Sequence, residues 1–231
     1  MNARHLTSML MFALLATGAS AEDPVLSEFQ ADQVCRFPNG KTQLVYRVMA
    51  APDKVRLEHK GKHPDLVTLQ RRDLGVVWTL VPSTHRYTEE KLSADGFASA
   101  LRIAGPVVAD ETLDAEMING MACEKHRIEV PTVSQGKTGT AEAVVWTCPQ
   151  LPYPVRIQRP DGNVSELLNI IGGSQPEGVF EVPEDYVKVD GIMAALSAPP
   201  VAPTNAMPPD PKGQRPASFN VKSYKWKFGV R

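Results

Sequence analysis

The sequence is poor in cysteine and in aromatic residues, and it has no excess of charge of either sign. Its 231 residues include three cysteines, 6% aromatic residues, and 25 basic against 26 acidic side chains, for a formal net charge of −1. A nucleic-acid partner requires a basic field on the protein surface, so this balance excludes that class of partner. Three cysteines are an odd number, so one disulfide leaves one cysteine unpaired.

Long hydrophobic runs are also missing beyond the first 21 residues, so no later segment is expected to cross a membrane. The start of the chain combines Arg4 and His5 with an apolar run at residues 9–16 and the small residues 19–21. This order is typical of a secretory signal peptide, which we expect at residues 1–21. The mature chain is then an exported protein, and a bacterial periplasm is the expected compartment.

Motifs of catalytic or metal-binding residues are absent as well. Residues 172–176 read Gly-Gly-Ser-Gln-Pro and lack the second glycine of a serine-hydrolase motif, and no glycine-rich phosphate loop occurs. His59 and His63 stand four apart in a turn segment, where two solvated histidines are a simpler interpretation than a zinc site without further ligands. We therefore expect a protein that is not an enzyme and that uses no metal and no cofactor. A catalytic cluster assembled only by the fold is the alternative.

Alternating apolar and polar residues predict β-strands in the first half of the chain. The central stretch is Leu66–Tyr87, where two strands, residues 67–70 and 76–81, flank a turn that ends at Gly75. Earlier strands are expected at 42–49 and 55–58, each bounded by turn residues. Together these segments predict a meander of short antiparallel strands.

Two other segments have the spacing of helices. Val25, Leu26 and Phe29 recur at helical intervals, which predicts a short helix within residues 22–33. Residues 89–103 begin with acidic side chains and continue with apolar ones at similar intervals. This pattern predicts a second helix, interrupted near Asp95-Gly96 and closed by Gly105-Pro106.

The second half of the chain contains two hairpin signals, and the first of them predicts a disulfide. A hairpin that turns at Gln135-Gly136 places Cys123 opposite Cys148 on adjacent strands, close enough for a bond in an oxidising compartment. Two buried free thiols are the alternative, and Cys35 is left over in either case. A second hairpin is predicted at Asp161-Gly162, between two alternating runs.

Composition divides the mature chain into a folded domain at residues 22–196 and a tail at residues 197–231. The tail begins with a proline-rich linker, which we expect to be extended and disordered. Its end, residues 220–231, alternates lysines with three aromatic residues, Tyr224, Trp226 and Phe228. This segment either docks on the domain or contacts an anionic membrane surface or the sheet edge of a partner protein in the cell envelope.

Four segments resemble the LolA-like superfamily of periplasmic outer-membrane lipoprotein carriers. They include Pro-Asp-Lys-Val-Arg-Leu-Glu at 52–58, the stretch 67–87, Ile-Asn-Gly-Met-Ala-Cys-Glu-Lys-His at 118–126, and residues 178–186. The resemblance implies an α+β fold in which a strongly curved antiparallel β-sheet, an unclosed barrel, wraps around one or two helices that act as a lid. It also implies that the concave apolar face takes up an acyl chain or a lipoprotein.

The expected function is therefore that of an exported binding protein that takes part in lipoprotein sorting. The candidates for the cavity lining are large apolar residues, although an ordinary core would also use them: Trp78, Leu80, Tyr87, Phe97, Leu101 and Trp146. The resemblance also implies a strand arginine that holds the lid shut, for which Arg47 and Arg56 are candidates by position. The alternative is an envelope scaffold or sensor that binds a protein partner through the C-terminal tail.

Overall fold

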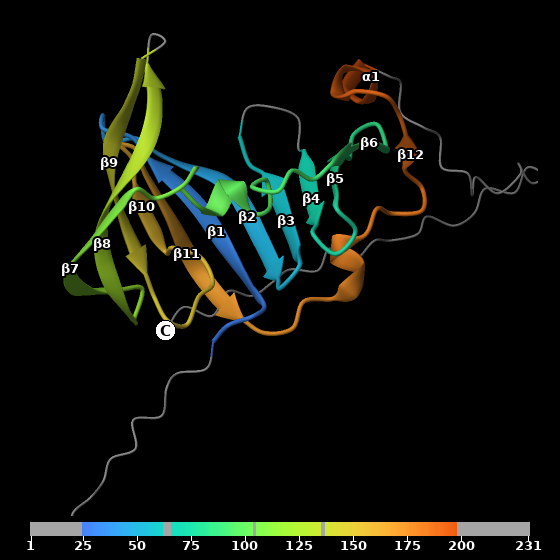
Figure 1. Cartoon of the computed structure of the whole chain (residues 1–231). Coiled ribbons are helices and arrows are strands. Elements are labelled where there is room, and N and C mark those ends of the chain that lie inside the picture. The colour runs from blue at the N-terminus through green and yellow to red at the C-terminus, as the bar shows by residue number, and fades with distance from the viewer. Residues whose placement is uncertain (1–24, 62–65, 104, 135–136, 198–231) are drawn as a thin grey trace, which may run out of the picture.

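The computed structural model describes residues 25–61, 66–103, 105–134 and 137–197, and within them it contains one twelve-stranded sheet (Figure 1). The strands are β1 (Phe29–Arg36), β2 (Thr42–Ala51), β3 (Lys54–His59), β4 (Val67–Arg71), β5 (Val76–Val81), β6 (Arg86–Lys91), β7 (Ala109–Ile118), β8 (Met121–Ser134), β9 (Lys137–Thr147), β10 (Arg156–Gln158), β11 (Val164–Gly172) and β12 (Val187–Lys188). The other elements are two 3₁₀ turns and one α-helix: η1 (Ser99–Leu101), η2 (Glu177–Phe180) and α1 (Ile192–Ser197).

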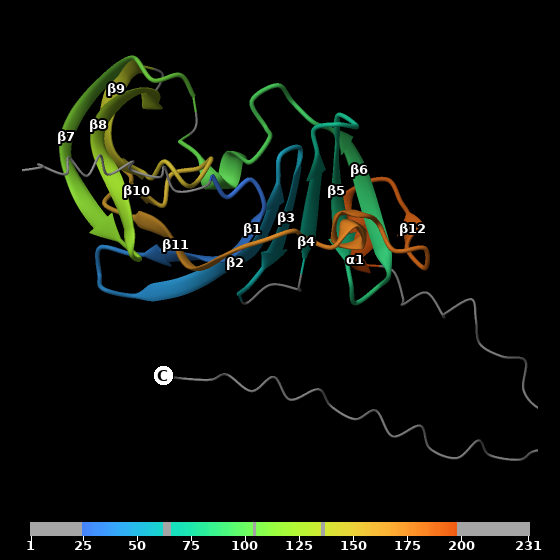
Figure 2. The same cartoon turned by 90° about the horizontal axis from the view of Figure 1, so that it is seen from below.

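The sheet is strongly curved and does not close into a barrel. Its strands follow the order β12-β6-β5-β4-β3-β2-β1-β11-β10-β9-β8-β7, so β12 and β7 are the two end strands. All neighbours pair antiparallel except β12 and β6, which are parallel. Figure 2 shows that the sheet bends around a hollow and that η1 lies inside it. The curved, unclosed antiparallel sheet expected from the sequence is confirmed.

The hairpin of β4 and β5 forms as its alternating pattern predicts. Leu69 pairs with Trp78, and Gln70 pairs with Val77. Gly75 takes a φ of +68° in the turn between the strands, a conformation that glycine adopts without steric cost. The meander from β2 to β6 is therefore local, with each strand paired to the next along the chain.

The short helix expected within residues 22–33 is wrong, because from Phe29 onward this segment is strand β1. Phe29, Ala31 and Gln33 are buried on alternate positions, which is the period of a strand. β1 lies between β2 and β11 near the middle of the sheet, so both of its edges are hydrogen-bonded. These pairings outweigh the weak helical spacing.

The helix expected at residues 89–103 is also wrong for most of its length. Strand β6 continues to Lys91, and the only helical turn in this segment is η1, three residues long. Ala98 precedes η1 with a φ of +54°, in the left-handed region, so the predicted right-handed helix cannot run through this residue. The helix that the structure does contain, α1, was not predicted, and it packs against β5 and β6 at the other end of the sheet.

The predicted disulfide between Cys123 and Cys148 is confirmed, with Cα atoms 4.2 Å apart. The register of β8 and β9 pairs Glu124 with Thr147, so Cys123 and Cys148 are the next two residues to lie opposite each other. The turn at Gln135-Gly136 lies outside the described residues, but the register it was expected to set is the one observed. A disulfide is consistent with an exported protein.

Cys35 on β1 is the free thiol expected from the odd count, and it is half-buried. Desolvation raises the pKa of this thiol, which disfavours the reactive thiolate.

Both ends of the chain lie outside the described residues, including the expected signal peptide (1–21) and all but the first residue of the expected tail (197–231). Within the described ranges, no helix has the length and hydropathy needed to cross a membrane.

Candidate functional site

Strand pairing assigns the side chains of the sheet to an inner and an outer face. Directly paired residues lie on the same face, and successive residues alternate between faces. Gln70, Val55, Ala50 and Phe29 are linked in this way across β4, β3, β2 and β1. These residues form the inner face, because Gln70 contacts the segment that lies in the hollow. Leu69 and its pairing partners therefore belong to the outer face.

Residues 92–103, which we call the plug, cover the inner face. This segment connects β6 to β7 and places η1 in the hollow of the sheet (Figure 2). Phe97 and Leu101 are only 5% and 2% exposed, and Ala98 is fully buried. All three pack in one cluster with inner-face residues such as Val48 and Leu57. The plug therefore supplies apolar side chains where a separate lid helix was expected.

Two buried glutamines fasten the plug to the sheet. The side-chain oxygen of Gln70 accepts a hydrogen bond from the backbone N–H of Ala98 at 2.6 Å. The side-chain nitrogen of Gln33 donates to the backbone carbonyl of Ala100 at 2.8 Å. Breaking either bond without replacement leaves a buried polar group unsatisfied, which costs about 1–3 kcal/mol. These bonds also stabilise the unusual backbone conformation at Ala98.

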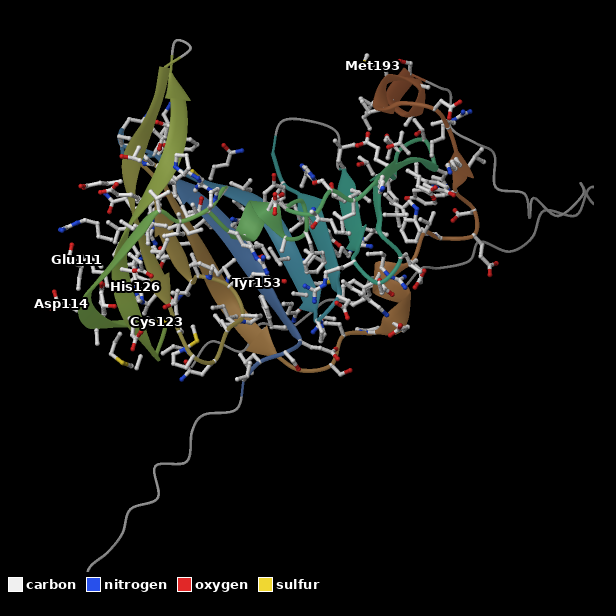
Figure 3. The ribbon with its side chains drawn as sticks, in the orientation of Figure 1. Glu111, Asp114, Cys123, His126, Tyr153 and Met193 are labelled. Atoms are coloured by element: carbon white, nitrogen blue, oxygen red, sulfur yellow. A yellow bond between two sulfur atoms is a disulfide. The ribbon has the colours of Figure 1, made fainter. Side chains whose placement is uncertain are left out.

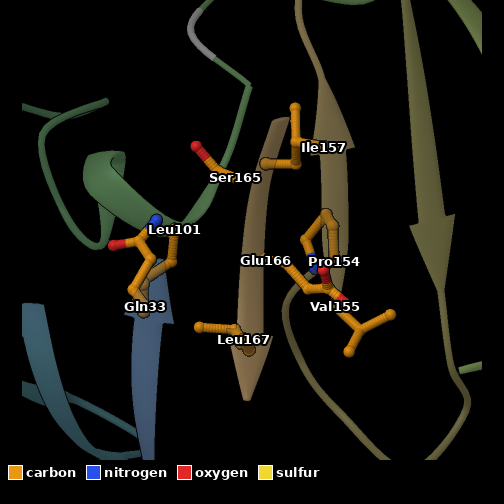
Figure 4. Close-up of a pocket in the computed structure, with 8 residues that line it drawn as sticks. All are labelled: Gln33, Leu101, Pro154, Val155, Ile157, Ser165, Glu166 and Leu167. Atoms are coloured by element: carbon orange, nitrogen blue, oxygen red, sulfur yellow. The ribbon is translucent and has the colours of Figure 1, made fainter. Parts of the chain in front are cut away.

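One cavity beneath the plug, lined by described residues, is very small. The cavity below Leu101 has a volume of about 10 Å³ and is lined by Gln33, Pro154, Val155, Ile157, Ser165, Glu166 and Leu167 (Figure 4). This space is no larger than a single water molecule requires. At this position the inner face has no room for an acyl chain unless the plug moves.

A much larger pocket opens at the rim of the plug. It has a volume of about 580 Å³, and Phe97, Ile103 and Pro106 provide its apolar lining. Arg72 and Arg102 contribute two guanidinium groups to the same pocket, and Asp95 contributes one carboxylate. A volume of this size is typical of small-molecule sites.

Aromatic rings and a carboxylate hold these two arginines in place. The guanidinium carbon of Arg72 lies 4.8 Å from the ring centre of Phe97, and that of Arg102 lies 5.4 Å from the ring centre of Tyr153. Arg72 also forms a 2.6 Å ion pair with Asp53, which neutralises part of its charge. The rim of the plug thus combines an apolar surface with cationic groups.

The six residues proposed for a cavity lining do not form one group. Phe97 and Leu101 belong to the plug, on the inner side of the sheet. Trp78, Leu80 and Tyr87 instead join a separate cluster on the outer face, together with Val67, Leu69, Val182 and Tyr186. The indole nitrogen of Trp78 donates to Glu89 at 2.9 Å on that side.

Trp146, the sixth candidate, belongs to the same core cluster as Phe97 and Leu101, and charged side chains lie around its ring. The cationic groups of Lys125 and Arg156 lie 5.4 Å and 5.3 Å from its ring centre. Its indole nitrogen donates to Glu116 at 2.7 Å. It lines neither the cavity below Leu101 nor the rim pocket.

Within the described ranges, neither arginine proposed to hold a lid forms an ion pair or a hydrogen bond with the plug. Arg47 approaches Asp32 at 3.5 Å on a partly exposed part of the sheet. Arg56 pairs with Glu58 at 3.1 Å and donates to the backbone carbonyl of Val179 at 3.0 Å. Arg56 therefore fastens η2 to the outer face.

Arg71 has the same role on the outer face and is itself buried. It forms two bonds with Asp73, at 2.7 Å and 2.9 Å, and it also contacts Glu181 and the carbonyl of Phe180. The hydrogen bond from Arg71 is the main cause that lowers the pKa of Asp73 below its usual value. Pairing with the two carboxylates raises the pKa of Arg71 in turn.

This pairing predicts a loss of stability in acid. A carboxylate whose pKa is lowered by folding stabilises the protein fully above its usual pKa, and that contribution disappears as the pH falls through the lowered value. We expect the free energy of unfolding to fall more steeply below about pH 4 in the wild type than in Asp73→Asn. Urea unfolding between pH 7 and pH 3 measures both slopes, and equal slopes would contradict the assignment.

Sequence reasoning missed the two glutamines and the two rim arginines. The alternation in β4 correctly separates Gln70 from Leu69, but it does not tell which of them faces the hollow. The sequence pattern places Gln33 in the first predicted helix and Arg102 in the second. The signal that could have identified the glutamines is a polar side chain at a buried strand position. This signal can be recognised only when the pairing register of the strands is known.

Within the described ranges, no group of three or more His, Cys, Asp or Glu side chains is arranged to hold a metal ion. The candidate site combines apolar contacts, two amide hydrogen bonds, two guanidinium groups and the carboxylate of Asp95. These groups can bind a ligand through apolar contacts and through ion pairs with the two guanidinium groups.

Comparison with known proteins gives no family for this chain. No family model matches the sequence, and no curated protein matches it. Among solved structures, an uncharacterized conserved protein from Thermus thermophilus is similar over 71% of this chain and 90% of its own, with 17% identity and a TM-score of 0.49. LprF from Mycobacterium bovis is similar over 68% of this chain and 89% of its own, with 16% identity and a TM-score of 0.34. PNGF-II is similar over 73% of this chain and 32% of its own, with 12% identity and a TM-score of 0.44. At this level the likeness carries no statement about function.

Proposed function

We propose that this chain is an exported binding protein, without enzymatic activity, that holds an acyl chain or the acyl group of a lipoprotein against the inner face of its sheet. The observation that carries the proposal is the plug, because an apolar loop occupies the concave face where a ligand would lie. The plug is held by apolar contacts and by the hydrogen bonds of Gln33 and Gln70. A ligand of similar hydrophobicity can replace those contacts when the plug moves.

The rim pocket supports the same proposal. An amphiphile needs an apolar surface for its chain and a cation for its carboxylate or phosphate head. Phe97, Ile103 and Pro106 supply the first, and Arg72 and Arg102 supply the second. The resemblance of the sequence to LolA-like carriers favours an acyl ligand and a role in lipoprotein sorting.

Gln70→Met tests whether plug opening limits binding. Methionine has a similar volume but accepts only weak hydrogen bonds, so the buried N–H of Ala98 loses its partner and the closed state loses about 1–3 kcal/mol. Binding that requires an open plug should then tighten by about five-fold or more. Titration of the purified mature protein with a fluorescent fatty acid measures the dissociation constant.

Gln158→Met is the matched control, because Gln158 is exposed on β10 and alternates with Ile157, so its side chain lies on the face of the sheet opposite to the plug. This variant should bind the fatty acid like the wild type. Unchanged or weaker binding by Gln70→Met would contradict the proposed role of the plug.

The second candidate function is an envelope scaffold or sensor with a filled core. The small volume below Leu101 favours it, because the inner face already has an occupant. A scaffold should bind no fatty acid in either variant. The same titration therefore separates the two functions.

A further inference from the structure

Strand β7 forms a long, open edge of the sheet. Among the described residues it pairs only with β8, and of its ten residues only Ile118 is buried. The backbone N–H and C=O groups along its outer edge are free to pair with another strand. The opposite edge is different, because β12 has only two residues and α1 packs beside it against β6.

The edge strand is acidic. β7 carries four carboxylates and no basic residue: Asp110, Glu111, Asp114 and Glu116. Three of them have partners on other strands of the sheet. Asp110 lies 3.0 Å from His126 of β8, Glu111 lies 2.8 Å from Arg127 of β8, and Glu116 lies 3.4 Å from Arg156 of β10. Asp114 has no partner in the part of the chain that the structure describes. Figure 3 shows Glu111 and Asp114 at this end of the sheet.

Apolar side chains accompany these charges. Val107 and Val108 immediately precede β7 and are 50% and 56% exposed, and Met117 near its end is 66% exposed. A strand that adds to β7 should therefore carry basic and large apolar residues together. A second copy of β7 does not fit, because two acidic strands repel each other.

The chain itself contains a segment of the required composition. Residues 220–231 include four basic side chains and no acidic one, and Tyr224, Trp226 and Phe228 alternate with lysines. Alternation of this kind presents an aromatic stripe on one face of a strand and lysines on the other. Aromatic residues also favour strand conformation.

We propose that residues 220–231 add to the free edge of β7 in the same molecule and cap the sheet. The described chain ends in α1, which contacts β6. Ten strand spacings separate β6 from β7, at most roughly 50 Å. Residues 198–219 span roughly 70 Å when extended as polyproline II, so the segment reaches β7. The tether also raises the local concentration of the segment at its docking site.

Hydrogen exchange of the mature full-length protein tests this docking. Residues 107–118 should exchange at least ten-fold faster in a variant in which Tyr224, Trp226 and Phe228 are all serine than in the wild type. Glu111→Lys combined with Asp114→Lys should accelerate exchange in the intact chain to a similar extent. The double charge variant should add little in the serine background, because both changes remove the same contact.

The charge control is Glu90→Lys combined with Glu184→Lys, which changes the net charge equally but leaves β7 intact. In this control, the amides of residues 107–118 should exchange at the wild-type rate.

Equal exchange rates in the wild type and the serine variant would overturn the proposal. Protection that increases with protein concentration would overturn docking within one molecule. Loss of binding to phosphatidylglycerol vesicles in the serine variant, with unchanged exchange at β7, would assign the segment to the membrane surface.

Discussion

Replacing Phe97 by alanine is expected to lower the free energy of unfolding by about 3–4 kcal/mol. Phe97 belongs to the plug and is almost completely buried against the inner face, and the guanidinium group of Arg72 lies over its ring. Truncation removes this apolar burial and leaves a cavity next to Leu101. Chemical denaturation followed by circular dichroism measures the change.

Leu74→Ala is the control for this prediction, because Leu74 lies in a turn and is more than half exposed. Its effect should stay within about 0.5 kcal/mol. If the inner face binds acyl chains, a saturating fatty acid should raise the melting temperature of Phe97→Ala more than that of the wild type, because the ligand fills the vacated volume. A loss below about 1 kcal/mol in Phe97→Ala would show that the plug is not part of the core.

Removing the disulfide with Cys123→Ala and Cys148→Ala is expected to cost about 3.5 kcal/mol, from the entropy of the 25-residue loop that the bond closes. Both cysteines are buried in the main core cluster, so alanine keeps the site apolar. Urea unfolding of the oxidised wild type and of the double variant gives the difference. The same loss should follow when the wild type is unfolded in the presence of a reductant.

Cys35→Ala is the matched control, because this thiol is unpaired and only half-buried. Its unfolding free energy should differ from that of the wild type by no more than about 1 kcal/mol. A double variant as stable as Cys35→Ala would contradict a stabilising role for the bond.

The fold was predictable where short-range signals set the register. The hairpin of β8 and β9 brings Cys123 opposite Cys148 because the number of residues between the cysteines and the turn is equal on both sides. The β4–β5 hairpin was predictable for the same reason, since Gly75 marks its turn. These elements depend on neighbours along the chain.

The two segments that were wrongly predicted as helices owe their conformation to contacts with residues far away in the sequence. The apolar residues of segment 25–33 fit the period of a helix about as well as that of a strand. Pairing with β11, more than a hundred residues later in the chain, determines that the segment from Phe29 onward is a strand. The plug shows the same problem, because Leu101 and Phe97 are apolar in either conformation. Only the packing of the sheet makes the segment an irregular loop.

The candidate site was predictable only in part. Phe97 and Leu101 were named from their hydrophobicity, but Trp78, Leu80 and Tyr87 have the same character and lie on the outer face. Composition does not separate the two faces of a sheet whose strands are apolar on both sides. The glutamines that hold the plug could be recognised only after the register of the strands was known.

If the inner face binds an acyl chain when the plug moves, a photoreactive fatty acid should label the residues of that face. A fatty acid with a diazirine at the end of its chain would be bound to the mature protein, irradiated and mapped by mass spectrometry. We expect labels on Val48 and Leu57 of the inner face and on residues 97–101 of the plug. Labels confined to the outer cluster of Leu69, Trp78 and Tyr186, or no labelling above that of a denatured control, would contradict it.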